Sequence, residues 1–241
     1  MNSNPIAQKS NLTPEQDQAI RKRFIQVIFQ ALLMGVILFI SAGTLDWPMA
    51  WLMMGFYVVM LAVNAILMIR RNPEMVAERA EVKEGTKDWD RVLTSLGALL
   101  WLLILLVTGL DKRFSWSSDF SLYIQLLVFI FVVLGYSFAS WAMLSNPFFA
   151  GTVRIQEERG HSVATTGPYR YVRHPGYSGW SLANLATPIA LGSLVGLVPA
   201  VLFLLNLIIR TAKEDQTLQD ELDGYKEYTE QVRYRLLPGV W

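Results

Sequence analysis

The sequence predicts an all-α, polytopic integral membrane protein with about six transmembrane helices. Of its 241 residues, 53% are hydrophobic and only 17% are charged, a balance that is unusual for a soluble domain. The apolar residues also gather into six segments close to the length, about 20 residues, that a helix needs to cross a bilayer. These segments are 24–44, 47–69, 92–110, 122–144, 177–194 and 195–209.

The first four segments are long enough to span a membrane separately. The last two are short and nearly contiguous around Gly192, Ser193 and Gly196, so we expect a tight helical hairpin. Segment 1–23 is polar and is expected to remain in the cytosol. In the loop that follows the second segment, a capping asparagine, a first-turn proline and a terminating glycine predict a surface helix over 72–85.

The distribution of basic residues predicts the orientation. Lys112 and Arg113 are the only basic residues in the loops on one side of the predicted bundle, and all the others lie on the opposite side. Basic loops remain in the cytoplasm. We therefore expect both termini, and the polar loop that begins after residue 145, to face the cytoplasm.

Composition excludes several kinds of site. The chain has no cysteine and two histidines, and its net charge is +1. A thiolate metal site, a disulfide framework and a histidine-rich di-iron site are thereby excluded. We expect no metal and no nucleic-acid partner, because no basic field is present to attract phosphates.

Segment 161–177, which reads HSVATTGPYRYVRHPGY, carries both histidines, two arginines and three tyrosines. The Gly-Pro and His-Pro pairs predict an ordered loop instead of a helix. Taken singly, the arginines fit cytoplasmic anchors and the tyrosines fit interfacial belt residues. Such groups are costly to desolvate unless they are paired or bind something. Together they predict a ligand pocket that faces the cytosol.

A second polar stretch begins where the last apolar segment ends. Arg210 and Glu214 lie four residues apart and share one helix face. Leu218, Leu222 and Tyr225 continue the helical stripe into the cytosol. An exposed ion pair that only solvates the end of the helix is the simpler interpretation of Arg210 and Glu214.

The two polar stretches together resemble the isoprenylcysteine carboxyl methyltransferase family, which is related to the phospholipid N-methyltransferases. The resemblance covers about residues 146–241, and Asp215 stands where a second glutamate is usual. The motifs that carry it are HSVA at 161–164, GPY at 167–169, RHPGY at 173–177, Arg210, Glu214, Leu218, GYKEY at 224–228 and residues 232–238.

The resemblance implies a membrane methyltransferase that uses S-adenosyl-L-methionine. It implies that 146–241 is the catalytic region, with two membrane helices and a C-terminal cytosolic helix, after four membrane helices in 24–145. Arg210 would be the catalytic residue on the substrate side. The implied cofactor-binding residues are Gln156, His161, Ser162, Val163, Ala164, Tyr169, His174, Pro175, Gly176, Tyr177 and Glu214.

The acceptor is expected to be a lipophilic small molecule that enters from the bilayer. Membrane lipids are the other expected partners. The segments NPFF at 146–149 and RIQ at 154–156 resemble a bacterial branch of the family, which implies a bacterial inner membrane. A carboxylate acceptor would need only orientation by Arg210. An amine or a thiol would need a base, for which His174 or Glu214 is available.

Two other functions remain open at this point. Sterol reductases have a related membrane fold and bind NADPH, whose extra phosphate would favour Arg154, Arg170 or Arg173 as partners. A transporter or a non-enzymatic scaffold is the third alternative. Transporters usually carry ionisable or helix-breaking residues near the middle of their spans, and the first four segments here have almost none.

Overall fold

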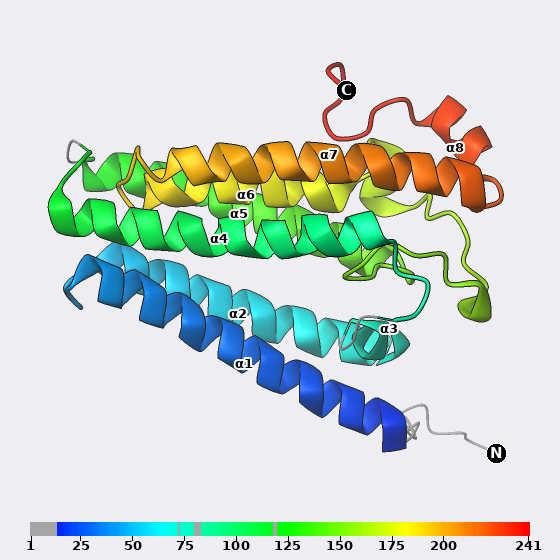
Figure 1. The fold of residues 1–241 in the computed structure, drawn as a ribbon, viewed down its shortest axis with the longest axis horizontal. Coiled ribbons are helices and arrows are strands. Elements are labelled where there is room, and N and C mark those ends of the chain that lie inside the picture. Colours follow the sequence, from blue (N-terminus) through cyan, green and yellow to red (C-terminus); the bar gives the residue numbers. More distant parts are fainter. Residues whose placement is uncertain (1–13, 72, 80–82, 118–119) are drawn as a thin grey trace, which may run out of the picture.

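The computed structural model describes residues 14–71, 73–79, 83–117 and 120–241, and within these residues it contains helices and no strand. This confirms the predicted all-α class. The long helices run side by side along one common direction (Figure 1). Their bounds are α1 Pro14–Ala42, α2 Pro48–Arg71, α3 Pro73–Glu78, α4 Asp88–Phe114, α5 Leu122–Ser145, α6 Pro175–Ala190, α7 Leu197–Glu221 and α8 Tyr225–Gln231, with short 3₁₀ turns η1 Glu157–Arg159 and η2 Gly167–Arg170.

Four helices are long and apolar enough to cross a bilayer: residues Ile20–Ala42 of α1, and α2, α4 and α5. They leave large apolar side chains exposed, such as Ile25, Ile40 and Leu127. In water such surfaces would be unfavourable, whereas against lipid chains they are solvated. The chain is therefore an integral, multi-pass membrane protein.

The predicted hairpin of 177–209 appears as α6 and α7, which contact each other along the bundle. Gly192 has φ +87 in the turn between them, a conformation that favours glycine. α6 has only 16 residues, and α7 has 25 but becomes charged from Arg210 onward. Neither is among the four helices with the length and apolarity of a span, so six spans remain a prediction.

α5 and α6 approach each other closely because small residues line their contact. A Cβ on Gly135 would lie 2.6 Å from the carbonyl oxygen of Gly179, and a Cβ on Gly179 would lie 2.5 Å from that of Gly135. Small residues allow such close backbone approach between membrane helices. This contact fixes α6, whose first turn carries part of the polar loop, against the membrane bundle.

The surface helix predicted over 72–85 is shorter and more buried than expected. α3 spans Pro73–Glu78; Asn72 and residues 80–82 lie outside the described part of the chain. Met75 and Val76 are buried in a cluster with Ile20 and Met143. Burial of this apolar face outweighs the charged composition of the loop, and α3 packs against both α1 and α2.

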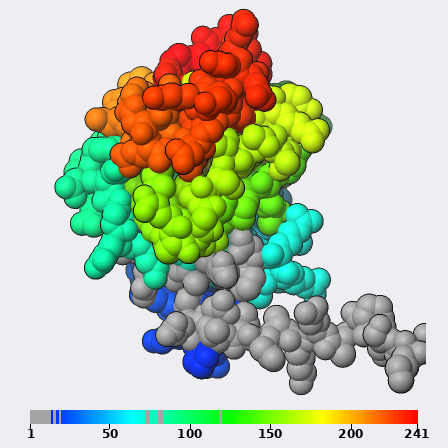
Figure 2. Space-filling model, turned by 90° about the vertical axis from the view of Figure 1, so that its right-hand side faces the viewer, coloured from blue at the N-terminus to red at the C-terminus, as the bar shows by residue number. Residues whose placement is uncertain are grey.

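The polar segments gather at one end of the bundle. The loop that joins α5 to α6 lies there beside α8, the start of α4 and the end of α7 (Figure 1). Seen from that end, the 146–174 segment lies between the start of α4 and the C-terminal residues (Figure 2). Segments far apart in the sequence thus meet where the sequence predicted a ligand pocket.

Candidate active site

The loop after α5 is ordered by hydrogen bonds from its own side chains. Gln156 is 1% exposed, and its Nε2 donates to the carbonyl oxygen of Phe148 at 2.7 Å. Asn146 Oδ1 accepts from the backbone N–H of Phe148 at 2.9 Å, and its Nδ2 donates to the Tyr169 hydroxyl at 3.4 Å. A buried amide needs these partners, and the hydrogen bonds of Gln156 and Asn146 therefore hold the loop in place.

Gly167 makes the turn into η2. It has φ +58, and a Cβ there would lie 2.4 Å from Ser145 Oγ. Only glycine fits both the left-handed backbone and the close approach. The turn brings Tyr169 to the end of α5, where Tyr228 of α8 donates from its hydroxyl to the Tyr169 carbonyl at 2.6 Å.

Asp215 is completely buried and joins three segments of the chain. Arg173 donates from Nε to Asp215 Oδ1 at 2.7 Å, and Arg235 donates from Nε to Oδ2 at 2.8 Å. His174 Nε2 lies 3.2 Å from Oδ1, and the Tyr225 hydroxyl donates to that oxygen at 3.1 Å. Burial acts to raise the pKa of Asp215, but the hydrogen bonds from His174 and Arg173 outweigh burial and lower that pKa well below its usual range.

Glu214, the residue before Asp215 in α7, lines the pocket beside this network. The Tyr177 hydroxyl donates a short hydrogen bond to its Oε2. Its Oε1 lies 4.0 Å from His174 Nδ1 and accepts no hydrogen bond from any described residue, and the side chain is 23% exposed. Glu214 therefore presents a carboxylate oxygen to whatever enters the pocket.

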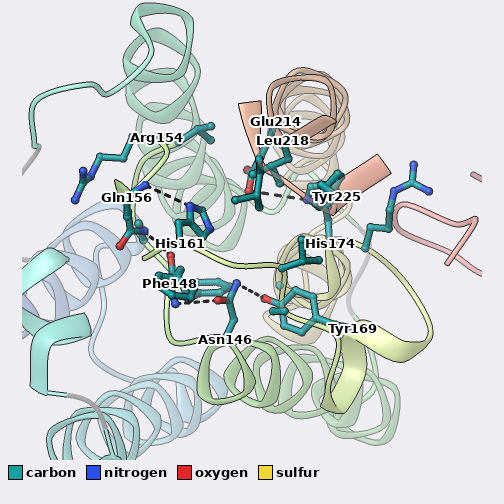
Figure 3. A pocket seen from close by; sticks show the side chains of 18 of the residues that line it. Asn146, Phe148, Arg154, Gln156, His161, Tyr169, His174, Glu214, Leu218 and Tyr225 are labelled. Atoms are coloured by element: carbon teal, nitrogen blue, oxygen red, sulfur yellow. Dashed lines mark hydrogen bonds and ion pairs between the residues drawn. The ribbon is translucent and has the colours of Figure 1, made fainter. Parts of the chain in front are cut away.

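A single pocket, with about 840 Å³ of empty space including its open mouth, brings these side chains together. Tyr169, His174 and Glu214, which come from η2, the start of α6 and α7, all line it (Figure 3). Every residue named above as catalytic or cofactor-binding lines this pocket except Pro175. Pro175 is buried in the first turn of α6, a position where a missing N–H costs nothing.

His161 contributes a neutral imidazole to the pocket. Its Nδ1 accepts the backbone N–H of Gln156 at 3.3 Å, and its ring lies 4.7 Å from that of Phe148. Burial first, and then the positive charges of Arg159 and Arg154, lower the pKa of His161 from 6.5 to about 4. Its Nε2 therefore carries the proton at neutral pH and can donate a hydrogen bond.

Arg210 is held by a residue that the sequence analysis did not select. Its Nε donates to Asp90 Oδ1 at 2.7 Å, and Asp90 is completely buried at the start of α4. Its Nη2 donates to the Gly151 carbonyl at 2.9 Å, and its guanidinium carbon lies 5.3 Å from the centre of the Tyr177 ring. Among the described residues nothing accepts from Nη1, so one end of the guanidinium is available to a ligand.

A second, larger pocket lies within the bundle and has about 1600 Å³ of empty space. Helices α1, α2, α4, α5, α6 and α7 all contribute to its lining. Most of the lining side chains are apolar or aromatic, such as Met60, Trp101 and Phe203. Trp180 and Arg210 line both pockets, so the polar pocket and the membrane cavity meet at these two side chains.

Two signals in the sequence point to the residues that were missed. Asp90 is a carboxylate at the start of a predicted span, and a buried charge requires a partner. Asp215 was noted only as a departure from the family motif, although it lies next to Glu214. Without the tertiary fold, neither signal identifies the partner.

The sequence model of the isoprenylcysteine carboxyl methyltransferase family matches residues 127–220. The chain is 29% identical over 164 residues to the protein-S-isoprenylcysteine O-methyltransferase of Schizosaccharomyces pombe, which covers 60% of this chain and 69% of that protein. It is 27% identical to protein-S-isoprenylcysteine O-methyltransferase A of Arabidopsis thaliana, covering 57% of this chain and 70% of that one.

Two further similarities bear on the fold and on the alternatives. The chain is 33% identical over 100 residues to a Delta(14)-sterol reductase of Mus musculus, which covers 40% of this chain but only 24% of the reductase. A solved structure of a eukaryotic intramembrane Ras methyltransferase, an isoprenylcysteine carboxyl methyltransferase, superposes with a TM-score of 0.53 at 18% identity. It covers 87% of this chain and 73% of that chain. This likeness shows a shared membrane fold.

Proposed function

Because the chain is similar to members of the isoprenylcysteine carboxyl methyltransferase family, we propose that it transfers the methyl group of S-adenosyl-L-methionine to the carboxylate of a lipophilic acceptor. The observation that carries this proposal is the meeting of two pockets at Trp180 and Arg210. A polar pocket suits a water-soluble methyl donor, and an apolar cavity between helices suits a lipid. The reaction needs both ligands at one place.

The polar pocket has the chemistry that the methyl donor requires. Glu214 Oε1 is free to accept from an ammonium group or a ribose hydroxyl. The backbone N–H groups of Ser162, Val163 and Ala164 donate to no described residue, so they can meet the edge of an adenine. Tyr177 and Trp180 offer aromatic faces, which attract cations.

When bound, S-adenosyl-L-methionine supplies an electrophilic methyl carbon whose leaving group is a neutral thioether, so no acid is needed. The chain's own residues orient the acceptor and exclude water. Arg210 can hold an acceptor carboxylate through its free Nη1, while Asp90 keeps the guanidinium in place. A fixed donor of this kind acts by orientation: it holds the carboxylate oxygen in line with the methyl carbon, and the carboxylate loses its charge as the ester forms.

The surroundings of the possible bases support a carboxylate acceptor over an amine or a thiol. His174 is 6% exposed, and its Nε2 is already engaged with Asp215 and Tyr225. The free Oε1 of Glu214 is occupied by the methyl donor in this proposal. Neither Trp180 nor Arg210, the residues at the junction, accepts a proton at neutral pH. A carboxylate is already a nucleophile and needs no base.

We also propose the cytoplasmic side of a bacterial inner membrane as the location of the donor pocket and of both termini. The basic loops support this orientation, and the donor is made in the cytosol. In this arrangement 146–241 supplies the donor pocket and 24–145 supplies most of the acceptor cavity.

Ligand binding by the purified protein in nanodiscs tests the proposal. S-adenosylhomocysteine is expected to raise the melting temperature, while NADPH leaves it unchanged. Isotope-labelled methyl donor is then expected to label an N-acyl S-prenyl cysteine, and the label should be released by mild base, as a methyl ester is. Stabilisation by NADPH alone would favour a reductase instead.

A further inference from the structure

Three arginines line the membrane cavity at the end where it meets the polar pocket: Arg23 of α1, Arg79 just after α3, and Arg210 of α7. Positively charged side chains are rare in a cavity lined mainly by apolar groups, and those that occur are usually paired. Arg210 has Asp90 as its partner. The other two arginines require a separate explanation.

Neither Arg23 nor Arg79 forms an ion pair with any acidic side chain that the structure describes. Arg23 donates from Nη1 to Gln26 Oε1 at 3.3 Å. Arg79 donates from Nη1 to the Ala150 carbonyl at 3.4 Å, and its buried Nε has no hydrogen-bond partner among the described residues. A buried, unsatisfied donor on a cation is costly, so these two groups gain most from an anion in the cavity.

Their position relative to Arg210 indicates where that anion would lie. Arg79 donates to the carbonyl of Ala150 and Arg210 donates to that of Gly151, so the two guanidinium groups contact consecutive residues of one loop. Arg79 also lies 5.4 Å from the centre of the Phe149 ring, and the Phe149 ring lies 5.9 Å from that of Trp180. Arg79 is therefore next to the junction of the two pockets, and Arg23 lines the same cavity.

The charges are also close enough to affect one another. Burial, followed by the positive charges of Arg23 and Arg210, lowers the pKa of Arg79 to about 9. By contrast, Arg71 and Arg91 are exposed and reach solvent, as cytosolic anchors of a membrane protein do. Arg23 and Arg79 face the cavity instead.

We propose that Arg23 and Arg79 form an anion subsite for a second negatively charged group on the headgroup of the acceptor. This inference rests on the proposed function, since it takes the cavity to be the acceptor site. The acceptor is then an amphiphile whose tail lies among Met60, Trp101 and Phe203 and whose headgroup carries a phosphate or a carboxylate beside the methylated group. No bond is made or broken at this subsite.

Binding of simple amphiphiles tests the subsite without any methyl transfer. The protein in zwitterionic nanodiscs is titrated with dodecyl phosphate, dodecyltrimethylammonium, dodecyl maltoside and inorganic phosphate, and tryptophan fluorescence gives each affinity. We expect dodecyl phosphate to bind about tenfold tighter than either of the other amphiphiles. Inorganic phosphate that binds as tightly as dodecyl phosphate would overturn a lipid ligand in favour of a free anion.

Paired variants identify the residues. Arg23→Gln with Arg79→Gln is expected to weaken dodecyl phosphate binding about ten- to a hundredfold, because hydrogen bonds to a charged group are lost. Arg71→Gln with Arg91→Gln removes two exposed cations and should change the affinity for dodecyl phosphate by less than about twofold. Arg79→Lys keeps the charge and should retain part of the affinity. Equal losses in both double variants would overturn the subsite.

S-adenosylhomocysteine binding separates this inference from the proposed function. The Arg23 and Arg79 double variant is expected to bind it as the unmodified protein does, which also shows that the variant is folded. If the unmodified protein binds S-adenosylhomocysteine but prefers no anionic amphiphile, only the subsite is wrong. If it does not bind S-adenosylhomocysteine, the proposed function is wrong.

Discussion

Asp90 Oδ1 accepts a hydrogen bond from Arg210 Nε at 2.7 Å, across 120 positions of the sequence. Asp90 also accepts the backbone N–H of Val153 at 2.8 Å. One carboxylate at the start of α4 thus fixes both the guanidinium at the junction of the two pockets and the loop beside it. We expect Asp90 to be a positioning residue for Arg210.

Asp90→Asn is expected to reduce kcat about a hundredfold, because Arg210 then loses the partner that orients it. The variant leaves a buried guanidinium without a counter-charge, which costs about 3–5 kcal/mol of stability. Asp88→Asn is the matched control, since Asp88 is exposed on the same turn of α4. Turnover assays and S-adenosylhomocysteine titrations on both variants check this; a normal kcat in the Asp90 variant contradicts the positioning role.

Arg210→Lys keeps a positive charge but loses the planar donor group. We expect kcat to fall about a hundredfold, because a lysine cannot hold Asp90 and a carboxylate at the same time. The affinity for S-adenosylhomocysteine should change by less than about twofold, because Glu214 and the 161–164 segment remain. Separate measurement of donor binding and turnover checks this. A variant with unchanged turnover would remove Arg210 from the reaction.

The contact between α5 and α6 predicts a local sensitivity to added volume. Gly135→Ala places a Cβ 2.6 Å from the Gly179 carbonyl, and such overpacking typically costs about 1–3 kcal/mol. Gly55→Ala is the control, since no atom of the described residues lies within 4 Å of a Cβ added there. The melting temperatures of the two variants, measured in one detergent, check this. Equal temperatures would mean that α5 and α6 can move apart without a loss of stability.

His161 predicts a pH dependence of stability. Burial and two arginines lower its pKa to about 4, while in the unfolded chain it is near 6.5. As the pH falls from 6.5 towards 4, the unfolded chain takes up a proton that the folded chain does not, so the free energy of unfolding decreases.

His161→Asn retains an acceptor for the Gln156 N–H but removes the titrating ring. Its melting temperature is expected to fall less between pH 7 and pH 5 than that of the unmodified protein. Identical slopes would show that His161 is equally basic in both states.

The sequence predicted the class of fold and part of the pocket lining for a physical reason. Long apolar segments form helices in a bilayer, because every backbone polar group needs a hydrogen bond there. The polar residues of 161–177 are costly to bury unless they pair with one another or bind a ligand. Tyr169, His174 and Glu214 therefore meet, as expected. Pro175 was expected in the pocket but does not line it. A proline is favourable in the first turn of a helix whether or not a ligand is bound.

The remaining features depend on long-range contacts. The pairing of Asp90 with Arg210 and the convergence of Arg173, Arg235 and Tyr225 on Asp215 have no local signature. The extent of α3 was overestimated because capping residues indicate where a helix can begin and end, whereas packing against Ile20 and Met143 determines which part of it is stable.

Because Trp180 and Arg210 are the only described residues that line both pockets, each ligand can arrive and leave by its own route. Steady-state kinetics should therefore be sequential, without a methylated enzyme form, and neither substrate should inhibit at high concentration by blocking the other's entrance. Esterification also removes the charge that Arg210 attracts, so the ester loses this contact and can leave through the bilayer, while the spent nucleoside returns to water.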